Sequence, residues 1–211
     1  MQILLVAASE LEIAPFLAQN PVIDHLITGV GSPSTIYHLT KRLQQIDYDL
    51  VIQAGIAGSF AESPALGEIV LVAADNFADL GITEKGNFYT IFEKGFADEN
   101  IAPFTNGWLK ADDEILKEFS VQKVRAITVN TVTDEKNKIA TLTSKFNPQI
   151  ETMEGAALHF VCLQENMPFL QLRSISNFVG ERDKTKWKTR EAIDRLNQAL
   201  GELVGGLRVE H

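Results

Sequence analysis

Four short runs of Val, Ile and Leu constrain the fold of this chain more than any other feature. They cover residues 3–8, 50–54, 67–73 and 169–175, and a fifth, less regular run covers 123–129. Apolar runs of this length are typical of strands that are buried on both faces of a sheet. Patterns with helical spacing accompany them at 34–45, 111–118, 152–165 and 189–207. Strands that alternate with helices predict an α/β domain with a parallel or mixed central sheet.

The length and charge of the chain narrow its class. A chain of 211 residues is long enough to bury a full core and short enough for one unit, so we expect a single domain over residues 1–211. The formal net charge of −9 disfavours nucleic acid as a partner, because phosphate binding requires a surplus of Lys and Arg. We therefore expect a small-molecule partner.

The termini and the cysteine content favour a cytoplasmic protein. Cys162 is the one cysteine, so an internal disulfide is excluded. The apolar N-terminus has no positively charged leader and is soon followed by Glu10 and Glu12, which predicts a buried strand rather than a signal peptide or a membrane span. The segment 79–108 is the least regular, and we expect either a long loop or an inserted hairpin there.

Loops that follow the apolar runs are the first place to look for a site, because ligands of such sheets bind at the carboxyl ends of strands. The candidate loops are 9–12, 29–32, 55–59, 130–134 and 176–180. The two glycine-rich loops have neither the Gly-x-Gly-x-x-Gly spacing of a dinucleotide fold nor the Gly-Lys-Ser/Thr ending of a P-loop. Their glycines permit either close approach to a ligand or close packing, and the sequence leaves both open.

Three polar side chains in or beside these loops are candidates for chemistry. Glu154 begins a helical pattern whose next residues are small, so its side chain can face a cavity, although the helix dipole alone also favours an acid there. Asn177 either satisfies local backbone groups or binds a base through its amide donor and acceptor. Glu12 is either a solvated acid at a helix start or a general base.

The order of several motifs resembles the purine nucleoside phosphorylase and nucleosidase superfamily. After Glu12 these motifs are Thr28-Gly29-Val30-Gly31, Gln53-Ala54-Gly55-Ile56-Ala57-Gly58, Leu66-Gly67-Glu68-Ile69-Val70, Glu151-Thr152-Met153-Glu154-Gly155-Ala156-Ala157 and Arg173-Ser174-Ile175-Ser176-Asn177. Within the superfamily, the chain is most similar to the methylthioadenosine/S-adenosylhomocysteine nucleosidases and the futalosine hydrolases. The resemblance implies a three-layer αβα sandwich, cleavage of a purine nucleoside without metal or organic cofactor, and a homodimer.

The resemblance also implies roles for particular residues. Met153 and Glu154 hold the ribose hydroxyls, and Glu12 activates the attacking water. Asn177 stands where the adenine-specific nucleosidases carry an Asp that protonates the departing base. An amide cannot donate a proton in that way, but it can hydrogen-bond the imidazole-side nitrogen and the carbonyl of a 6-oxopurine. We therefore expect an inosine-like substrate.

Further candidate substrate-binding residues come from three of the loops, namely Gly55, Ser176 and Thr131. The stretch around Thr131 departs from the aromatic-containing pattern of the adenine-specific enzymes. Which of Thr131, Val132 and Thr133 borders the base is left open by the sequence.

A basic segment at 180–190 contrasts with the acidic chain around it and contains Arg182 and Trp187. It is either a solvated loop before the last helix or a lid over an anionic aromatic group. Futalosine is an inosine whose 5′ extension ends in a carboxylated aromatic ring, so Arg182 could pair with the carboxylate and Trp187 could stack on the ring. The run Ser-Asn-Phe-Val-Gly-Glu-Arg-Asp also resembles futalosine hydrolases. The resemblance implies hydrolysis of futalosine to hypoxanthine and dehypoxanthine futalosine, a step of menaquinone biosynthesis.

Three other functions fit parts of the same pattern. A 6-oxopurine nucleoside phosphorylase would use phosphate as the nucleophile, but Arg42 is the one Arg before Arg125 and lies within a helical pattern, which favours water. A methylthioadenosine-type nucleosidase would have to tolerate Asn177. A non-catalytic nucleoside-binding protein is disfavoured by the presence of both Glu12 and Glu154.

Overall fold

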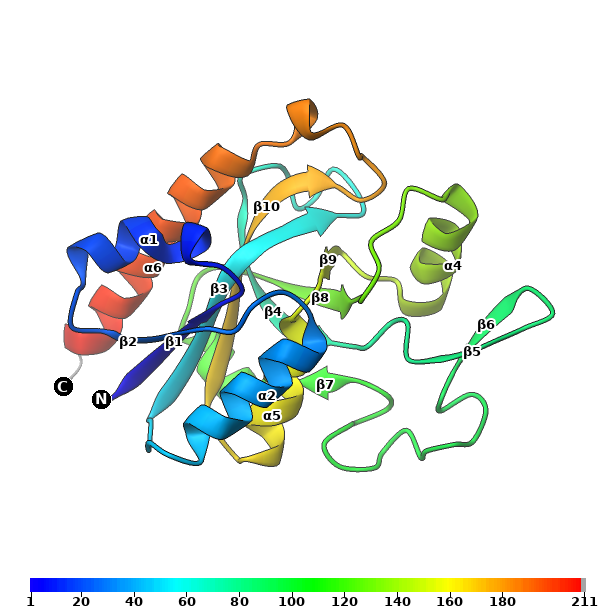
Figure 1. Ribbon diagram of the computed structural model, residues 1–211, viewed down its shortest axis with the longest axis horizontal. Helices are drawn as coiled ribbons and strands as arrows, with labels where there is room; N and C mark the ends of the chain where they lie inside the picture. Colours follow the sequence, from blue (N-terminus) through cyan, green and yellow to red (C-terminus); the bar gives the residue numbers. More distant parts are fainter. Residues whose placement is uncertain (210–211) are drawn as a thin grey trace.

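The computed structural model describes residues 1–209 and contains one large mixed sheet between helices (Figure 1). The strands, in chain order, are β1 (Ile3–Ala7), β2 (Asp24–Ile27), β3 (Leu50–Ser59), β4 (Ile69–Asp75), β5 (Gly81–Glu84), β6 (Asn87–Thr90), β7 (Leu109–Lys110), β8 (Gln122–Thr128), β9 (Ile150–Thr152) and β10 (Phe169–Phe178). The helices are α1 (Glu10–Gln19), α2 (Ser32–Leu43), α3 (Asp113–Lys117), α4 (Lys136–Phe146), α5 (Gly155–Gln164) and α6 (Thr189–Val209), with a short 3-10 turn at Lys184–Lys186. The predicted alternation of strands and helices is confirmed.

Strand β3 is the centre of the sheet. It pairs in parallel with β1 and with β10, while its last two residues, Gly58 and Ser59, pair antiparallel with β9. Strand β10 in turn pairs with β4, β4 with β8, and β8 with β9. These five strands therefore close into a ring, from which β1 and β2 extend as an open edge. The mixed central sheet is confirmed, and the ring follows from the ten-residue length of β3, which reaches β1 at one end and β9 at the other.

Two helical layers cover the sheet. Helices α1 and α6 pack on each other along one face, and α2 and α5 pack on each other along the other (Figure 1). The main core combines apolar side chains of β1, β3 and β10 with those of α5 and α6, including Cys162, which is fully buried. This arrangement is the expected three-layer αβα fold.

The structure extends or shifts several predicted elements. The predicted loop 9–12 is the start of α1, because Ser9 and Glu12 form a capping box there. The predicted helix 152–165 begins only at Gly155, since Thr152 belongs to β9. Helix α4 was not predicted, because only Leu142 and Phe146 of its polar sequence are buried.

The irregular segment 79–108 contains a hairpin and a series of turns. Strands β5 and β6 pair antiparallel around Lys85 and Gly86, both of which have positive φ, as a two-residue hairpin turn requires. The rest of the segment has no regular strand or helix before β7. Within residues 1–209, none of the helices has the length and apolar character needed to cross a membrane.

Gly155 allows α5 to pack closely on the sheet. A Cβ atom at this position would overlap the Asp75 carboxylate and the Gln171 side chain, both of which are buried in the sheet. We expect Gly155→Ala to lower the free energy of unfolding by roughly 1–3 kcal/mol, because a well-packed interior cannot accommodate the added methyl group. Urea unfolding measures this difference.

Gly201→Ala is the matched control, since Gly201 lies in α6 and a Cβ atom there would meet open space. We expect this change to stabilise the protein by roughly 0.5–1 kcal/mol through helix propensity. Equal stability of Gly155→Ala and the wild type would contradict this account of the packing between α5 and the sheet.

Candidate active site

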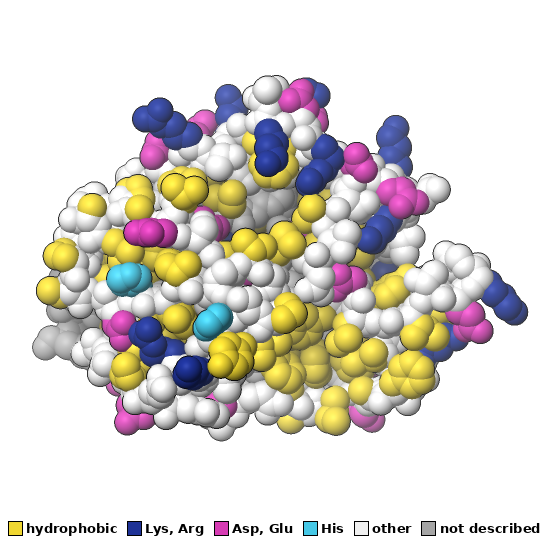
Figure 2. Space-filling model, viewed as in Figure 1, with side chains coloured by type: hydrophobic (Ala, Val, Ile, Leu, Met, Phe, Trp, Pro, Cys, Tyr) yellow, Lys and Arg dark blue, Asp and Glu magenta, His cyan; other side chains and the backbone are white. Residues whose placement is uncertain are grey.

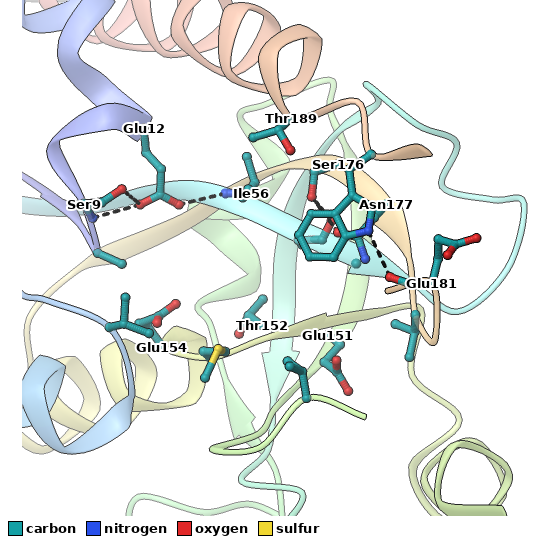
Figure 3. Close-up of a pocket in the computed structure, with 18 of the residues that line it drawn as sticks. Ser9, Glu12, Ile56, Glu151, Thr152, Glu154, Ser176, Asn177, Glu181 and Thr189 are labelled. Carbon is teal, nitrogen blue, oxygen red and sulfur yellow. Dashed lines mark hydrogen bonds between the residues drawn. The ribbon is translucent and has the colours of Figure 1, made fainter. Parts of the chain in front are cut away.

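The carboxyl ends of β1, β3 and β10 surround a cavity of about 370 Å³, a size typical of small-molecule sites (Figure 3). Glu12 and Glu154 lie at one end of it, and Asn177 and Glu151 lie at the other. The cavity therefore brings together the acids and the amide that the sequence placed in separate loops. Of the other expected residues, it is lined by Met153, Ser176, Arg182 and Trp187.

Glu12 is held rigidly in the first turn of α1. One carboxylate oxygen accepts hydrogen bonds from the Ser9 backbone N–H at 3.0 Å and from its hydroxyl at 3.1 Å, and the other accepts one from the Ile56 N–H at 3.2 Å (Figure 3). The residue is 9% exposed. A carboxylate has about four acceptor positions, so one is left for a water molecule or a ligand.

Glu154 is the N-cap residue of α5, yet its side chain makes no hydrogen bond that caps the helix. The first helical N–H groups are satisfied by threonine hydroxyls of the sheet: Gly155 donates to Thr152 at 3.1 Å, and Ala156 donates to Thr128 at 2.7 Å. The Glu154 carboxylate instead accepts the Gly31 N–H at 2.8 Å, at the start of α2. Because the threonine hydroxyls satisfy these N–H groups, the Glu154 side chain is not needed as a cap, and it lines the cavity.

Arg173 supplies a buried positive charge next to both acids. Its guanidinium donates to Gln171 at 3.0 Å and to Gln53, and the residue is 1% exposed. Burial lowers the pKa of Arg173, whereas the charges of Glu154, Glu12 and Asp75 raise it. Burial likewise raises the pKa of Glu154, and Arg173 opposes that shift. The sequence motif contained Arg173, but the sequence analysis assigned it no role.

Gly55 lies beside these charged groups rather than on the cavity wall. A Cβ atom there would overlap the Arg173 guanidinium and would lie 3.0 Å from Glu12 Oε1. The absence of a side chain at Gly55 therefore provides space for Arg173. Gly55 was expected to contact the substrate, but it is not among the residues that line the cavity.

A β-bulge directs the polar residues at the end of β10. Ile175 pairs with Ala57 and Asn177 with Gly58, so Ser176 is the extra residue between them. The Ser176 hydroxyl donates to Asn177 Oδ1 at 2.8 Å, and Asn177 Nδ2 donates to the Phe178 carbonyl at 3.0 Å. These bonds orient the amide while one N–H and one oxygen lone pair are left for a ligand.

Glu151 is an acid in the cavity that the sequence analysis did not single out. It lies in β9, is 8% exposed, and its Oε2 atom has no hydrogen-bond partner among the described residues. Burial raises its pKa to about 7, and the charges of Lys138 and Arg182 oppose the shift. The one feature of the sequence that could have indicated Glu151 is its position, three residues before Glu154 in the same motif.

The basic segment after β10 forms one wall of the cavity. Trp187 Nε1 donates to the Glu181 carbonyl at 2.9 Å, and the Arg182 guanidinium lies 6.0 Å from the centre of the Trp187 ring. Lys186 pairs with the Glu181 carboxylate at 2.8 Å. Val132 and Thr133 also line the cavity. Thr131, which was expected to bind the substrate, is exposed and does not line it.

No group of three or more His, Cys, Asp or Glu residues in the described part of the chain is arranged to hold a metal ion. The polar side chains that line the cavity carry carboxylates, hydroxyls, one amide and the Arg182 guanidinium. Such a set suits a polar organic ligand with several hydroxyl groups.

Comparison with known proteins agrees with this geometry. The model of the Phosphorylase superfamily matches residues 3–205, and the chain belongs to that superfamily. It is 29% identical to the futalosine hydrolase of Thermus thermophilus over 97% of both chains. It is 32% identical to the futalosine hydrolase of Streptomyces coelicolor over 85% of this chain and 77% of the relative.

A solved structure shares the fold at lower sequence similarity. The futalosine hydrolase of Helicobacter pylori superposes with a TM-score of 0.80 at 16% identity, over 97% of each chain. The nucleoside phosphorylase-like fold is therefore confirmed.

The burial of Glu151 predicts a pH-dependent loss of stability. The folded protein holds the Glu151 proton up to a pKa of about 7, above the ordinary value of 4.5, so the unfolded chain ionises first as the pH rises. Stability therefore falls between about pH 4.5 and pH 7 and stays lower above this range. At pH 8 we expect Glu151→Gln to raise the free energy of unfolding by up to roughly 3 kcal/mol, so the variant should unfold at a higher urea concentration than the wild type. At pH 4.5 the two proteins should differ little.

Glu118→Gln serves as the control, because Glu118 is exposed and follows α3 away from the cavity. Its effect should be small and equal at both values of pH. A Glu151→Gln variant that is destabilised at pH 8 would show that the carboxylate makes net favourable contacts in the folded protein.

Proposed function

We propose that this chain hydrolyses the N-glycosidic bond of futalosine to give hypoxanthine and dehypoxanthine futalosine, a step of menaquinone biosynthesis. The main support is the division of one cavity into an acidic end with Glu12 and Glu154 and an amide end with Asn177. The similarity to two futalosine hydrolases over most of their length agrees with it.

The acidic end suits a ribose. Glu154 and Met153 line the cavity side by side, and we assign the Glu154 carboxylate to the ribose hydroxyls. Cleavage of the glycosidic bond develops positive charge on the sugar, and two fixed carboxylates stabilise that charge. Glu12 holds the attacking water through its free acceptor position and takes up the proton as the water adds to the sugar.

The amide end suits a 6-oxopurine. Asn177 offers one free N–H, and the leaving hypoxanthine presents two acceptors for it, an imidazole-side nitrogen and a carbonyl oxygen. Donation from the amide stabilises the negative charge that develops on the departing base. Adenine requires protonation by an acid at this place, so Asn177 favours hypoxanthine as the leaving group.

The basic segment suits the 5′ extension of futalosine. Arg182 and Trp187 line the same cavity and lie close to each other. A carboxylated aromatic ring would pair with the Arg182 guanidinium and stack on the Trp187 indole. We propose that this segment acts as a lid over that group.

Water is favoured over phosphate as the nucleophile. Arg182 is the one Arg or Lys among the cavity-lining residues, and it faces four carboxylates of the same cavity, Glu12, Glu151, Glu154 and Glu181. Arg42 is committed to an ion pair with Asp24 at 2.9 Å. A phosphate dianion would be repelled by the acids and would lack the pair of cations that usually binds it.

We expect the protein to release hypoxanthine from futalosine at the same rate with and without phosphate, and to cleave methylthioadenosine poorly. Chromatography of the free bases after incubation measures both rates. Replacing Asn177 by Asp should slow hypoxanthine release, because the amide donor is lost. A requirement for phosphate, or release of adenine from methylthioadenosine as fast as hypoxanthine from futalosine, would overturn the proposal.

Glu12→Gln should lower kcat for hypoxanthine release by roughly 10²–10⁴-fold, the usual loss on removing a general base. Glu10→Gln is the matched control, because Glu10 lies in the same turn of α1 but is exposed. The rate of Glu10→Gln should equal that of the wild type. An active Glu12→Gln variant would exclude Glu12 as the base.

We also propose that the protein is a homodimer formed through the surface beside α2. Val30, Tyr37 and Leu80 are 65%, 62% and 46% exposed, and an apolar hollow lined by Ile36 and Phe160 adjoins them. Figure 2 shows apolar side chains gathered between α2 and the β5–β6 hairpin. Exposed apolar surface of this kind is typical of a subunit interface.

Sedimentation of the wild type and two variants tests the dimer. Tyr37→Glu should weaken self-association by at least roughly tenfold, because a charge would be buried in the interface. Val22→Glu should have no effect, since Val22 is 86% exposed in the turn before β2, outside this surface. A wild-type protein that sediments as a monomer would exclude the proposed dimer.

We place the reaction in the cytoplasm. Cys162 is buried within α5, and burial raises the pKa of its thiol, so the residue acts as a small apolar side chain. A chain without a disulfide needs no oxidising compartment.

A further inference from the structure

Three neighbouring strands place Asn177, Gly58 and Glu151 in one row across the sheet. Gly58 of β3 pairs with Asn177 of β10 on one side and with Glu151 of β9 on the other. Strands lie about 4.8 Å apart, so the backbones of Asn177 and Glu151 are about 10 Å apart. Residues paired in this way point their side chains to the same face of a sheet.

Gly58 has no side chain of its own, and the side chains of Asn177 and Val179 lie over it. A Cβ atom built on it would lie 3.2 Å from Asn177 Nδ2, so the Asn177 side chain lies over the face of the sheet to which that Cβ would point. Gly58, Asn177 and Glu151 all line the cavity. A planar base in this cavity can therefore lie between Asn177 and Glu151.

Glu151 differs from Glu12 and Glu154, the acids at the other end of the cavity, because its Oε2 atom accepts no hydrogen bond. Glu12 accepts three hydrogen bonds and Glu154 accepts the Gly31 N–H, whereas Glu151 Oε2 has no partner among the described residues although the side chain is more than nine-tenths buried. Leaving a buried carboxylate oxygen unpaired is costly. Glu151 lines the cavity, so an N–H group of a ligand there would meet a carboxylate whose Oε2 atom has no other donor.

A 6-oxopurine offers such an N–H and adenine does not. In hypoxanthine N1 carries a proton, so it donates, whereas N1 of adenine carries a lone pair and accepts. We propose that Glu151 accepts a hydrogen bond from N1–H of the bound 6-oxopurine and is a specificity-determining residue of this site. Asn177 and Glu151 then bind the two edges of the base that meet at its carbonyl oxygen. This inference rests on the proposed cleavage of a 6-oxopurine nucleoside.

Two cations favour the ionised form of Glu151, the hydrogen-bond acceptor in this inference. Burial raises the pKa of Glu151, whereas the charges of Lys138 of α4 and Arg182 of the basic segment oppose that shift. A carboxylate that faces a lone pair on adenine N1 would be repelled, which adds to the discrimination made by Asn177. The two residues therefore select the same class of base by different atoms.

The test compares kcat/KM of the wild type, Glu151→Gln and Glu151→Ala on inosine and 1-methylinosine, which lacks the N1 proton. We expect Glu151→Ala to lower kcat/KM for inosine by roughly 10–100-fold, the loss typical of a hydrogen bond to a charged group. The same variant should change kcat/KM for 1-methylinosine by less than about threefold. Glu151→Gln, whose carbonyl can still accept, should retain part of the activity on inosine. Glu135→Gln is the control, because Glu135 is an exposed acid that does not line this cavity.

Equal losses on the two substrates, or no loss on inosine, would overturn the role of Glu151, and thermal unfolding of each variant shows whether it is folded. Failure of the proposed function has a different signature, since the wild type itself would then release no hypoxanthine from inosine or futalosine. In that case calorimetric binding of hypoxanthine and 1-methylhypoxanthine tests Glu151 directly. The wild type should bind hypoxanthine at least roughly tenfold more tightly than 1-methylhypoxanthine, and Glu151→Ala should abolish this preference. Equal binding of both bases by the wild type would contradict the role of Glu151.

Discussion

The buried guanidinium of Arg173 is the interaction on which the rest of the site depends. A fully buried charge is stable only with counter-charges and hydrogen bonds, and here Glu12 of α1, Glu154 before α5 and Asp75 of β4 supply the negative charge. Gln53 and Gln171 accept its N–H groups. One side chain of β10 thus ties two helix starts and two strands together beneath the cavity.

The same charge explains why acids can be concentrated at one end of the site. Burial and the neighbouring Glu12 charge raise the pKa of Glu154, and the Arg173 charge opposes that shift. The backbone N–H groups of Ile56 and Gly31 add fixed donors to Glu12 and Glu154. The opposite end lacks such a cation within the sheet, and its side chains present unsatisfied polar atoms to the cavity instead. This difference separates a sugar-binding end from a base-binding end.

Much of this organisation was predictable from the sequence. Apolar runs identified β1, β3, β4 and β10, and the order of motifs led to Glu12, Glu154 and Asn177, which meet in one cavity. The role of Gly55 as space for Arg173 was not predictable, because it depends on two strands in register. Glu151 was missed for the same reason, since the strand β9 that carries it is only three residues long and its partner Gly58 lies far away in the chain.

A crystal structure with a non-hydrolysable, carbon-linked inosine analogue tests the account most directly. The ribose hydroxyls should contact Glu154, with Glu12 on the side from which water attacks, and the base should lie next to Asn177. An analogue bound in the reverse direction, with its base beside Glu12 and Glu154, would contradict the assignment of the two ends of the cavity.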